Sequence, residues 1–118
     1  MNRLTLAAGL AGFLAVALGA FGAHGLEAIL TGEAKAWWET ATFYALSHAI
    51  AALALSLPGQ ARFIRAGWAF IVGAALFSGS LYAMALGAPS MLGMVTPLGG
   101  VTLLAGWIMT MLAATKKP

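Results

Sequence analysis

The sequence predicts an all-α integral membrane protein, a four-helix bundle with a short interfacial helix between its first two spans. Of 118 residues, 62% are hydrophobic and 8% are charged, against about 45–50% and about 25% in soluble domains. The apolar residues form four long runs separated by short polar or turn-forming stretches. A soluble chain this short cannot bury so much apolar surface, so we expect lipid to cover it. The length predicts one domain, residues 1–118.

The first apolar run, Leu4–Ala23, follows a short basic N-terminus and therefore resembles a signal peptide, with small residues at positions 20 and 22 where cleavage would occur. The run is long enough to form about 30 Å of helix, which matches the hydrocarbon core of a bilayer. Because three more apolar runs follow it, we expect this segment to remain in the protein as its first span.

The stretch between the first two spans, Gly25–Thr40, is too polar to cross a membrane. Apolar residues at spacing three to four predict a short interfacial helix, Leu26–Leu30. An apolar stripe that begins at Trp37 and reaches His48 predicts a second helix, which runs directly into span two, Ala41–Leu57.

The second half of the chain contains two further runs. A Pro-Gly turn at residues 58–59 separates span two from span three, Ala66–Leu86. Span four is Pro97–Ala114, and it begins with a residue pair typical of a helix start. Thr96 is the expected N-cap and Pro97 the expected first helical residue, since proline lacks only an amide that has no helical partner there.

The charges are segregated along the chain. The three acidic residues all lie between Gly25 and Thr40, together with Lys35. With four spans, the other five basic residues fall on one side of the membrane: Arg3, Arg62, Arg65, Lys116 and Lys117. Loops rich in Lys and Arg stay on the cytoplasmic side. The pattern therefore predicts cytoplasmic N- and C-termini, and it disfavours insertion in both orientations, which needs a nearly even count.

Several function classes find no support in the composition. The basic residues are scattered among membrane-flanking positions and do not form the clustered face of a nucleic-acid-binding protein. The chain has no Cys, so it has neither disulfides nor thiolate metal ligands. Neither a phosphate-binding loop nor a metal-ligand spacing occurs. We expect no nucleic-acid partner, no metal and no cofactor.

Small residues recur at spacing four in three of the spans. In lipid, helices associate through close backbone approach because the hydrophobic effect does not drive them together. The pattern predicts a tight bundle. Any small-residue face that the bundle does not use would be a surface for other membrane proteins or for self-association. The three ladders are Ala11, Ala15, Gly19 and Ala23; Ala75, Gly79, Ala83 and Gly87; and Thr102, Gly106, Thr110 and Ala114.

Polar residues inside the spans are the candidates for a functional site. Counted from the predicted span ends, His48 and Ser78 each lie about 12 Å below the same membrane face. This depth places the polar residues of spans two and three in one layer, in the half of the bundle away from the termini. The candidate ligand-binding residues are His48, Tyr44, Ser78, Tyr82, His24 and Thr96.

The polar layer has two interpretations. In the structural one, a neutral His48 is hydrogen-bonded across helices to Ser78 or Tyr82. In the other, His48 and its neighbours hold a small apolar ligand, such as a quinone or a lipid, or an ion, since a neutral imidazole both donates and accepts.

Catalytic interpretations of the same residues are disfavoured. A haem bound between His24 and His48 would span a depth difference of about 12 Å. A dyad of His48 with Ser78 or Ser80 would lack a carboxylate to orient the imidazole. A proton-coupled exporter would need a buried carboxylate, and every Glu lies in the loop between the first two spans. We expect no catalytic residues and no enzymatic activity.

Four motifs in order carry a family resemblance: GAFGAHGL (19–26), TATFYALSHA (40–49), LFSGSLYAMAL (76–86) and TPLGGVTLLAGW (96–107). The chain resembles the domain of unknown function 423 family, small multi-pass membrane proteins of bacteria with a related mitochondrial group called transmembrane protein 256. The resemblance implies a helical protein of the bacterial inner membrane without an assigned activity. Residues that recur in the family fall here on Gly22, His24, Gly25, Trp37, Tyr44, His48, Gly79, Thr96, Pro97, Gly99, Gly100 and Trp107.

The sequence thus leads to two functional hypotheses. The first is a non-enzymatic accessory or interaction subunit that packs against other membrane proteins or lipid. The alternative is a binder or transporter of a small apolar ligand or an ion, acting through the polar layer around His48.

Overall fold

The computed structural model describes residues 1–117, which form four long helices and no strand. The all-α prediction is confirmed, and the last residue of the predicted domain, 118, lies outside the described residues. The helices are α1 (Arg3–His24), α2 (Glu33–Leu55), α3 (Ile64–Ala85) and α4 (Val95–Ala114), and short 3-10 segments, η1 (Ala61–Phe63) and η2 (Ser90–Met94), lead into α3 and α4.

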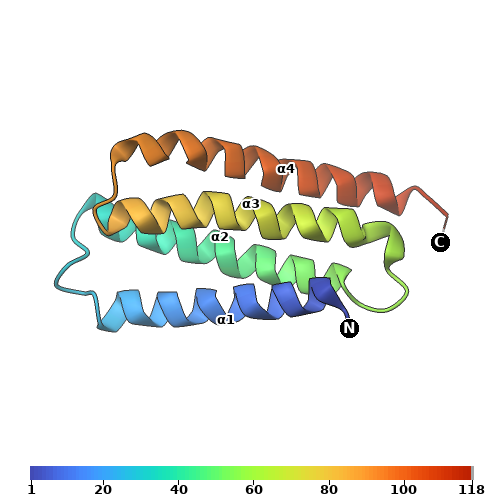
Figure 1. Cartoon of the computed structure of the whole chain (residues 1–118), viewed down its shortest axis with the longest axis horizontal. Helices are drawn as coiled ribbons and strands as arrows, with labels where there is room; N and C mark the ends of the chain where they lie inside the picture. Colours follow the sequence, from blue (N-terminus) through green and yellow to red (C-terminus); the bar gives the residue numbers. More distant parts are fainter. Residues whose placement is uncertain (118) are drawn as a thin grey trace.

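The helices run antiparallel and form a flattened row that follows the order of the chain (Figure 1). Helix α2 packs on α1 and α3, and α4 packs on α3, whereas α1 and α4 lie at opposite edges of the row. The molecule measures 51 × 26 × 18 Å. Because a row covers its edge helices on one side only, large apolar side chains such as Phe13 of α1 and Met111 of α4 remain exposed, where lipid would cover them.

Three of the four helical segments are long and apolar enough to cross a membrane: Arg3–His24, Ala61–Ala85 and Ser90–Ala114. Helix α2 is as long but more polar, since Glu33, Lys35 and Glu39 lie in its first two turns. It packs on α1 from the contact of Trp38 with Gly22 at one end to a hydrogen bond between Ser56 and Thr5 at the other. The assignment of α2 as the second span is therefore supported by its packing along α1 and not by its own hydropathy.

The charged residues lie at the two ends of the bundle, as the sequence predicts. Both termini and the connection between α2 and α3 share one end, which holds the five basic residues outside the α1–α2 loop region. At this end the side chain of Asn2 caps α1 and donates to the carbonyl of Ser56 at 2.7 Å. The loop between α1 and α2 and the start of α2, with Lys35 and all the glutamates, lie at the opposite end.

The prediction of an interfacial helix at Leu26–Leu30 is wrong. The segment forms two overlapping turns, in which the amides of Ile29 and Leu30 both bond to the carbonyl of Leu26, at 3.0 and 2.8 Å. Gly32 after it has φ 56°, outside the helical range, so these turns do not continue into α2. Leu30 is nevertheless buried, in a cluster with Trp38. The predicted helix that runs into span two is confirmed as α2.

Glycines bring α3 and α4 into close contact. A Cβ atom added at Gly99 would overlap the backbone nitrogen of Phe77, and one added at Gly73 would lie 2.9 Å from the backbone nitrogen of Leu103. Gly106 leaves room for the ring of Phe70, which is fully buried. The predicted tight helix packing is present here, although of these three glycines only Gly106 belongs to a predicted ladder.

The ladder on α3 differs from the other two because it faces away from the bundle. Ala75 and Gly79 are exposed, Ala83 is half-buried, and no atom lies within 4 Å of the position that a Cβ of Gly79 would occupy. The ladders on α1 and α4 each place members inside the bundle, Ala15 and Gly106. One small-residue face of the predicted three is therefore not used within the chain.

Candidate functional site

His48 lies near the middle of α2 and is 7% exposed. Its Nδ1 is 2.8 Å from the carbonyl of Tyr44, one turn earlier, and its Nε2 is 3.1 Å from the indole nitrogen of Trp107 on α4. An indole N–H can only donate, so Nε2 accepts and the proton is assigned to Nδ1. This arrangement requires a neutral imidazole, and it joins α2 to α4 across α3.

The predicted partners of His48 are wrong. The hydroxyl of Ser78 donates to the carbonyl of Ala41 at 2.7 Å, and the phenol of Tyr82 bonds to the hydroxyl of Thr42 at 2.6 Å. Ser78 is therefore level with Ala41, seven residues before His48, which is about 10 Å along a helix. The sequence predicts equal depths for His48 and Ser78 only because the depth of His48 is counted from Ala41, the predicted start of span two. Helix α2 in fact begins eight residues before Ala41, at Glu33.

Aromatic rings enclose His48. Tyr44 stacks on its imidazole at 5.9 Å and an interplanar angle of 7°, and the rings of Phe70 and Trp107 lie 5.4 and 5.9 Å away. From the sequence, Trp107 has no predicted role apart from its recurrence in the family that the chain resembles. The available signal was a tryptophan inside an apolar span, because a buried indole N–H usually requires a hydrogen-bond acceptor.

A groove of about 450 Å³ opens beside His48, between α2 and α4. Its lining is mostly apolar or aromatic: Tyr44, His48, Phe77, Pro97, Gly100, Val101, Leu103, Leu104 and Trp107. Both ring nitrogens of His48 already have partners. The groove can therefore accept an apolar group by contact with ring faces, while it offers few unused donors or acceptors for an ion.

Thr96 lies outside this groove and is not the N-cap of α4, contrary to prediction. The helix begins one residue earlier, at Val95, and the cap position is Met94. The hydroxyl of Thr96 instead bonds to that of Ser80 on α3. Pro97 is still in the first turn of α4, where its missing amide costs no helical hydrogen bond.

His24 is the last residue of α1 and is exposed. It lies at the loop end of the bundle, whereas His48 lies at mid-length of α2. The six predicted site residues thus do not form one site: Tyr44 and His48 line the groove, Ser78, Tyr82 and Thr96 join pairs of helices, and His24 stands apart. Within residues 1–117, no three His, Asp or Glu side chains could together hold a metal ion.

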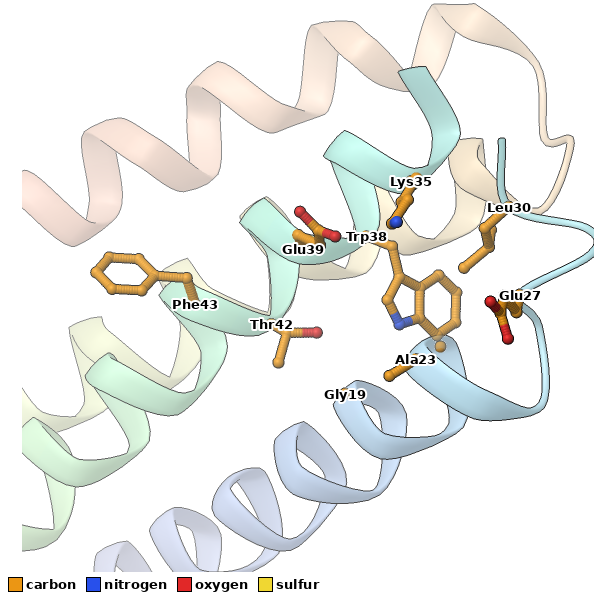
Figure 2. Close-up of a pocket in the computed structure, with 10 residues that line it drawn as sticks. Gly19, Ala23, Glu27, Leu30, Lys35, Trp38, Glu39, Thr42 and Phe43 are labelled. Carbon is orange, nitrogen blue, oxygen red and sulfur yellow. The ribbon is translucent and has the colours of Figure 1, made fainter. Parts of the chain in front are cut away.

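A second pocket, of about 470 Å³, lies between α1, the loop and α2 (Figure 2). Sequence reasoning missed it, since the charges of this region served only to predict topology. The lining residues are Gly19, Gly22, Ala23, Glu27, Leu30, Lys35, Trp38, Glu39, Thr42 and Phe43. The Trp38 indole donates to the carbonyl of Leu18 at 2.8 Å and lies against Gly22, where a Cβ would overlap it.

Long antiparallel helices with exposed apolar side chains, charges at both ends and hydrogen-bonded polar pairs between helices define a small multi-pass helical membrane protein. The chain belongs to the family described as "Protein of unknown function (DUF423)", whose profile matches residues 18–100. The predicted family membership is confirmed.

Relatives with similar sequences are membrane proteins of bacteria. The chain is 45% identical over 108 residues to UPF0382 membrane protein YwdK of Bacillus subtilis, covering 87% of this chain and 88% of the relative. It is 46% identical over 110 residues to a UPF0382 membrane protein of Haemophilus influenzae, covering 89% and 86%. It is 40% identical over 113 residues to UPF0382 inner membrane protein YgdD of Escherichia coli, covering 92% and 86%. No solved structure matches the chain.

Proposed function

We propose that the protein is a non-enzymatic interaction subunit of the bacterial inner membrane, and that the outer face of α3 packs against a transmembrane helix of another membrane protein or of a second copy. The observation that carries this proposal is the outward ladder of Ala75, Gly79 and Ala83. In lipid, a face of small residues favours association because it lets two helix backbones approach closely.

The surroundings of the ladder support this role. The exposed side chains of Val72 and Leu76 lie on the same side of α3, about two turns and one turn before Gly79. The relatives that match nearly the whole chain have names that specify a membrane protein and no activity. The name of the Escherichia coli relative, an inner membrane protein, supports the proposed inner-membrane location.

The orientation belongs to the same proposal. Both termini face the cytoplasm, because five of the six basic residues lie at their end of the bundle. The chain has no native cysteine, so single cysteines at Glu33 and Lys117 can be labelled without background. We expect a membrane-impermeant maleimide to label the Glu33 position from outside intact cells and the Lys117 position only after lysis. Labelling of both from one side contradicts the topology.

Two matched substitutions test the interaction face. Gly79→Leu adds a large side chain to the outer face of α3, while Gly9→Leu adds the same side chain at another helical glycine with open space around it, on α1. Crosslinking in native membranes through a photoreactive residue at Ala83 should capture a helix, either a partner or a second copy. We expect Gly79→Leu to abolish the crosslink and Gly9→Leu to preserve it. Equal crosslinking in both variants, or none in the wild type, contradicts the proposal.

The groove beside His48 supports a second candidate function, the binding of a small apolar ligand such as a quinone or lipid. Gly100 lines the groove, and a Cβ there would make only ordinary contacts, at 3.8 Å from the ring of Phe77. Gly100→Leu therefore fills the groove without forcing the helices apart. We expect a bound molecule to be extracted from the purified wild type and the Gly9→Leu control, but not from Gly100→Leu. A wild type without such a molecule contradicts this candidate.

A further inference from the structure

We propose that the pocket between α1 and α2 binds a phospholipid whose headgroup carries both an ammonium and a phosphate group. This site is distinct from the outer face of α3 and from the groove at His48, so the proposal does not rest on either function above. The pocket lies at the loop end of the bundle, opposite the end that holds the chain termini.

The polarity of the pocket changes along its length. Glu27 of the loop and Lys35 of α2 lie on the loop side of the Trp38 indole, Glu39 follows on the other side of it along α2, and Phe43 lies at the far end (Figure 2). From Lys35 to Phe43 the distance along α2 is about 12 Å. Phe43 is 67% exposed to the surroundings that lipid would fill. A molecule that follows this gradient has a charged head at the membrane surface and an apolar chain that points into the bilayer.

The charged side chains that line the pocket determine which lipid headgroup it fits. Two carboxylates, Glu27 and Glu39, and one ammonium, Lys35, line the same pocket. The carboxylates favour a cationic group, and Lys35 supplies a donor for a phosphate oxygen. A headgroup with only an anionic charge could bind Lys35 but would leave the two carboxylates without a cationic partner. A zwitterionic amine–phosphate headgroup matches both signs.

The apolar part of the pocket is preformed. The indole of Trp38 is fixed by its bond to the carbonyl of Leu18, by its packing on Gly22 and by an edge contact with Tyr82 at 4.5 Å between ring centroids. Ala23 presents only a small side chain at the α1 side of the opening. The volume, about 470 Å³, falls within the range of about 300–1,000 Å³ for small-molecule sites. It can hold a headgroup and the first part of one acyl chain.

Native mass spectrometry of the detergent-purified full chain tests the headgroup, with phosphatidylethanolamine and phosphatidylglycerol of identical acyl chains added in equal amounts. We expect the wild type to retain more phosphatidylethanolamine. An ion pair near the surface contributes about a two- to fivefold preference. Glu27→Gln combined with Glu39→Gln should abolish this preference. The matched control is Glu33→Gln, because Glu33 lies on α2 but outside the pocket lining, and it should leave the preference unchanged.

A second pair of variants tests the apolar part. Ala23→Leu fills the pocket, whereas Ala20→Leu adds the same side chain at an exposed α1 residue that does not line it. We expect Ala23→Leu to lower adduct formation with both lipids and Ala20→Leu to leave it unchanged, with both variants retaining wild-type helicity by circular dichroism. Soluble phosphoethanolamine should not displace the lipid. The proposal is overturned if the wild type binds both lipids equally, or if the preference survives the double Gln substitution.

Discussion

The interfaces at the two edges of the row use glycine in different ways. Between α3 and α4, Gly99 and Gly73 meet backbone atoms of the opposite helix. Between α1 and α2, Gly22 meets the ring of Trp38, and a pocket remains beside that ring. A backbone contact cannot be relieved by rotating a side chain, while a ring contact can. The first interface therefore joins two helices rigidly, and the second holds a side chain in place and leaves adjacent space that a ligand can enter.

The largest expected effect tests the rigid interface. Gly99→Ala should lower the free energy of unfolding by about 3 kcal/mol, the upper part of the usual range for overpacking, because the added Cβ overlaps the backbone nitrogen of Phe77. Reversible unfolding in mixed micelles measures this change. Gly100→Ala is the matched control, since its nearest contact is 3.8 Å, and it should cost little. Equal stabilities of the two variants would show that α3 and α4 are not tightly joined.

Gly22→Ala should have a smaller effect, a loss of about 2 kcal/mol, because the Trp38 ring can move at the expense of its hydrogen bond to Leu18. A double-mutant cycle separates the two interfaces. In a Trp38→Ala background, Gly22→Ala should cost almost nothing, since the clash is removed. In a Phe77→Ala background, Gly99→Ala should remain as costly, since the backbone clash persists. If Phe77→Ala also removed the cost of Gly99→Ala, the two interfaces would not differ in how their glycine contacts can be relieved.

The bond between His48 and Trp107 connects the two halves of the row, and its loss should have a modest effect. Trp107→Phe keeps an aromatic ring and removes the N–H donor to His48. We expect a loss of about 0.6 kcal/mol, the mean for hydrogen bonds between membrane helices. His48→Gln should behave similarly and show coupling to Trp107→Phe. Trp68→Phe, on the exposed face of α3, serves as the control. If the effects of His48→Gln and Trp107→Phe simply add, the assigned hydrogen bond is contradicted.

The smallest effect is expected outside both interfaces. Gly79→Ala should raise the stability of the isolated protein by about 0.5 kcal/mol, because alanine restricts the unfolded chain and favours the helix and no atom opposes its Cβ. The same unfolding assay measures the change. A substantial loss of stability would show that the outer face of α3 is packed within the chain.

Much of the fold could be predicted because lipid leaves the backbone few alternatives. A chain in hydrocarbon must satisfy its own hydrogen bonds, so long apolar runs become helices, and the charges between them separate the two ends. The start of α2 could not be found in this way. The apolar stripe that begins at Trp37 predicts a helix running into span two, whereas α2 begins four residues earlier, in the polar stretch at Glu33.

The candidate site was less predictable than the fold. Hydrogen-bond partners depend on which residues are level with each other, and counting depth from assumed span ends misplaced His48 relative to Ser78 by about two turns. The pocket at Trp38 depends on a tertiary contact with Gly22 of another helix. No local pattern encodes such a contact, although the charged residues that line the pocket are evident in the sequence.

The row in which each helix packs on its predecessor has a consequence for synthesis. As the chain leaves the ribosome, α2 can pair with α1, α3 with α2, and α4 with α3, so each inserted helix finds its neighbour already in the bilayer. Contacts between consecutive elements are also the ones that form fastest in folding. The imidazole of His48 makes a contact that skips a helix, because its Nε2 accepts the hydrogen bond from the Trp107 indole only when α4, the last helix made, has been inserted. The hydrogen bond between His48 and Trp107 can therefore form only after all four helices have been inserted.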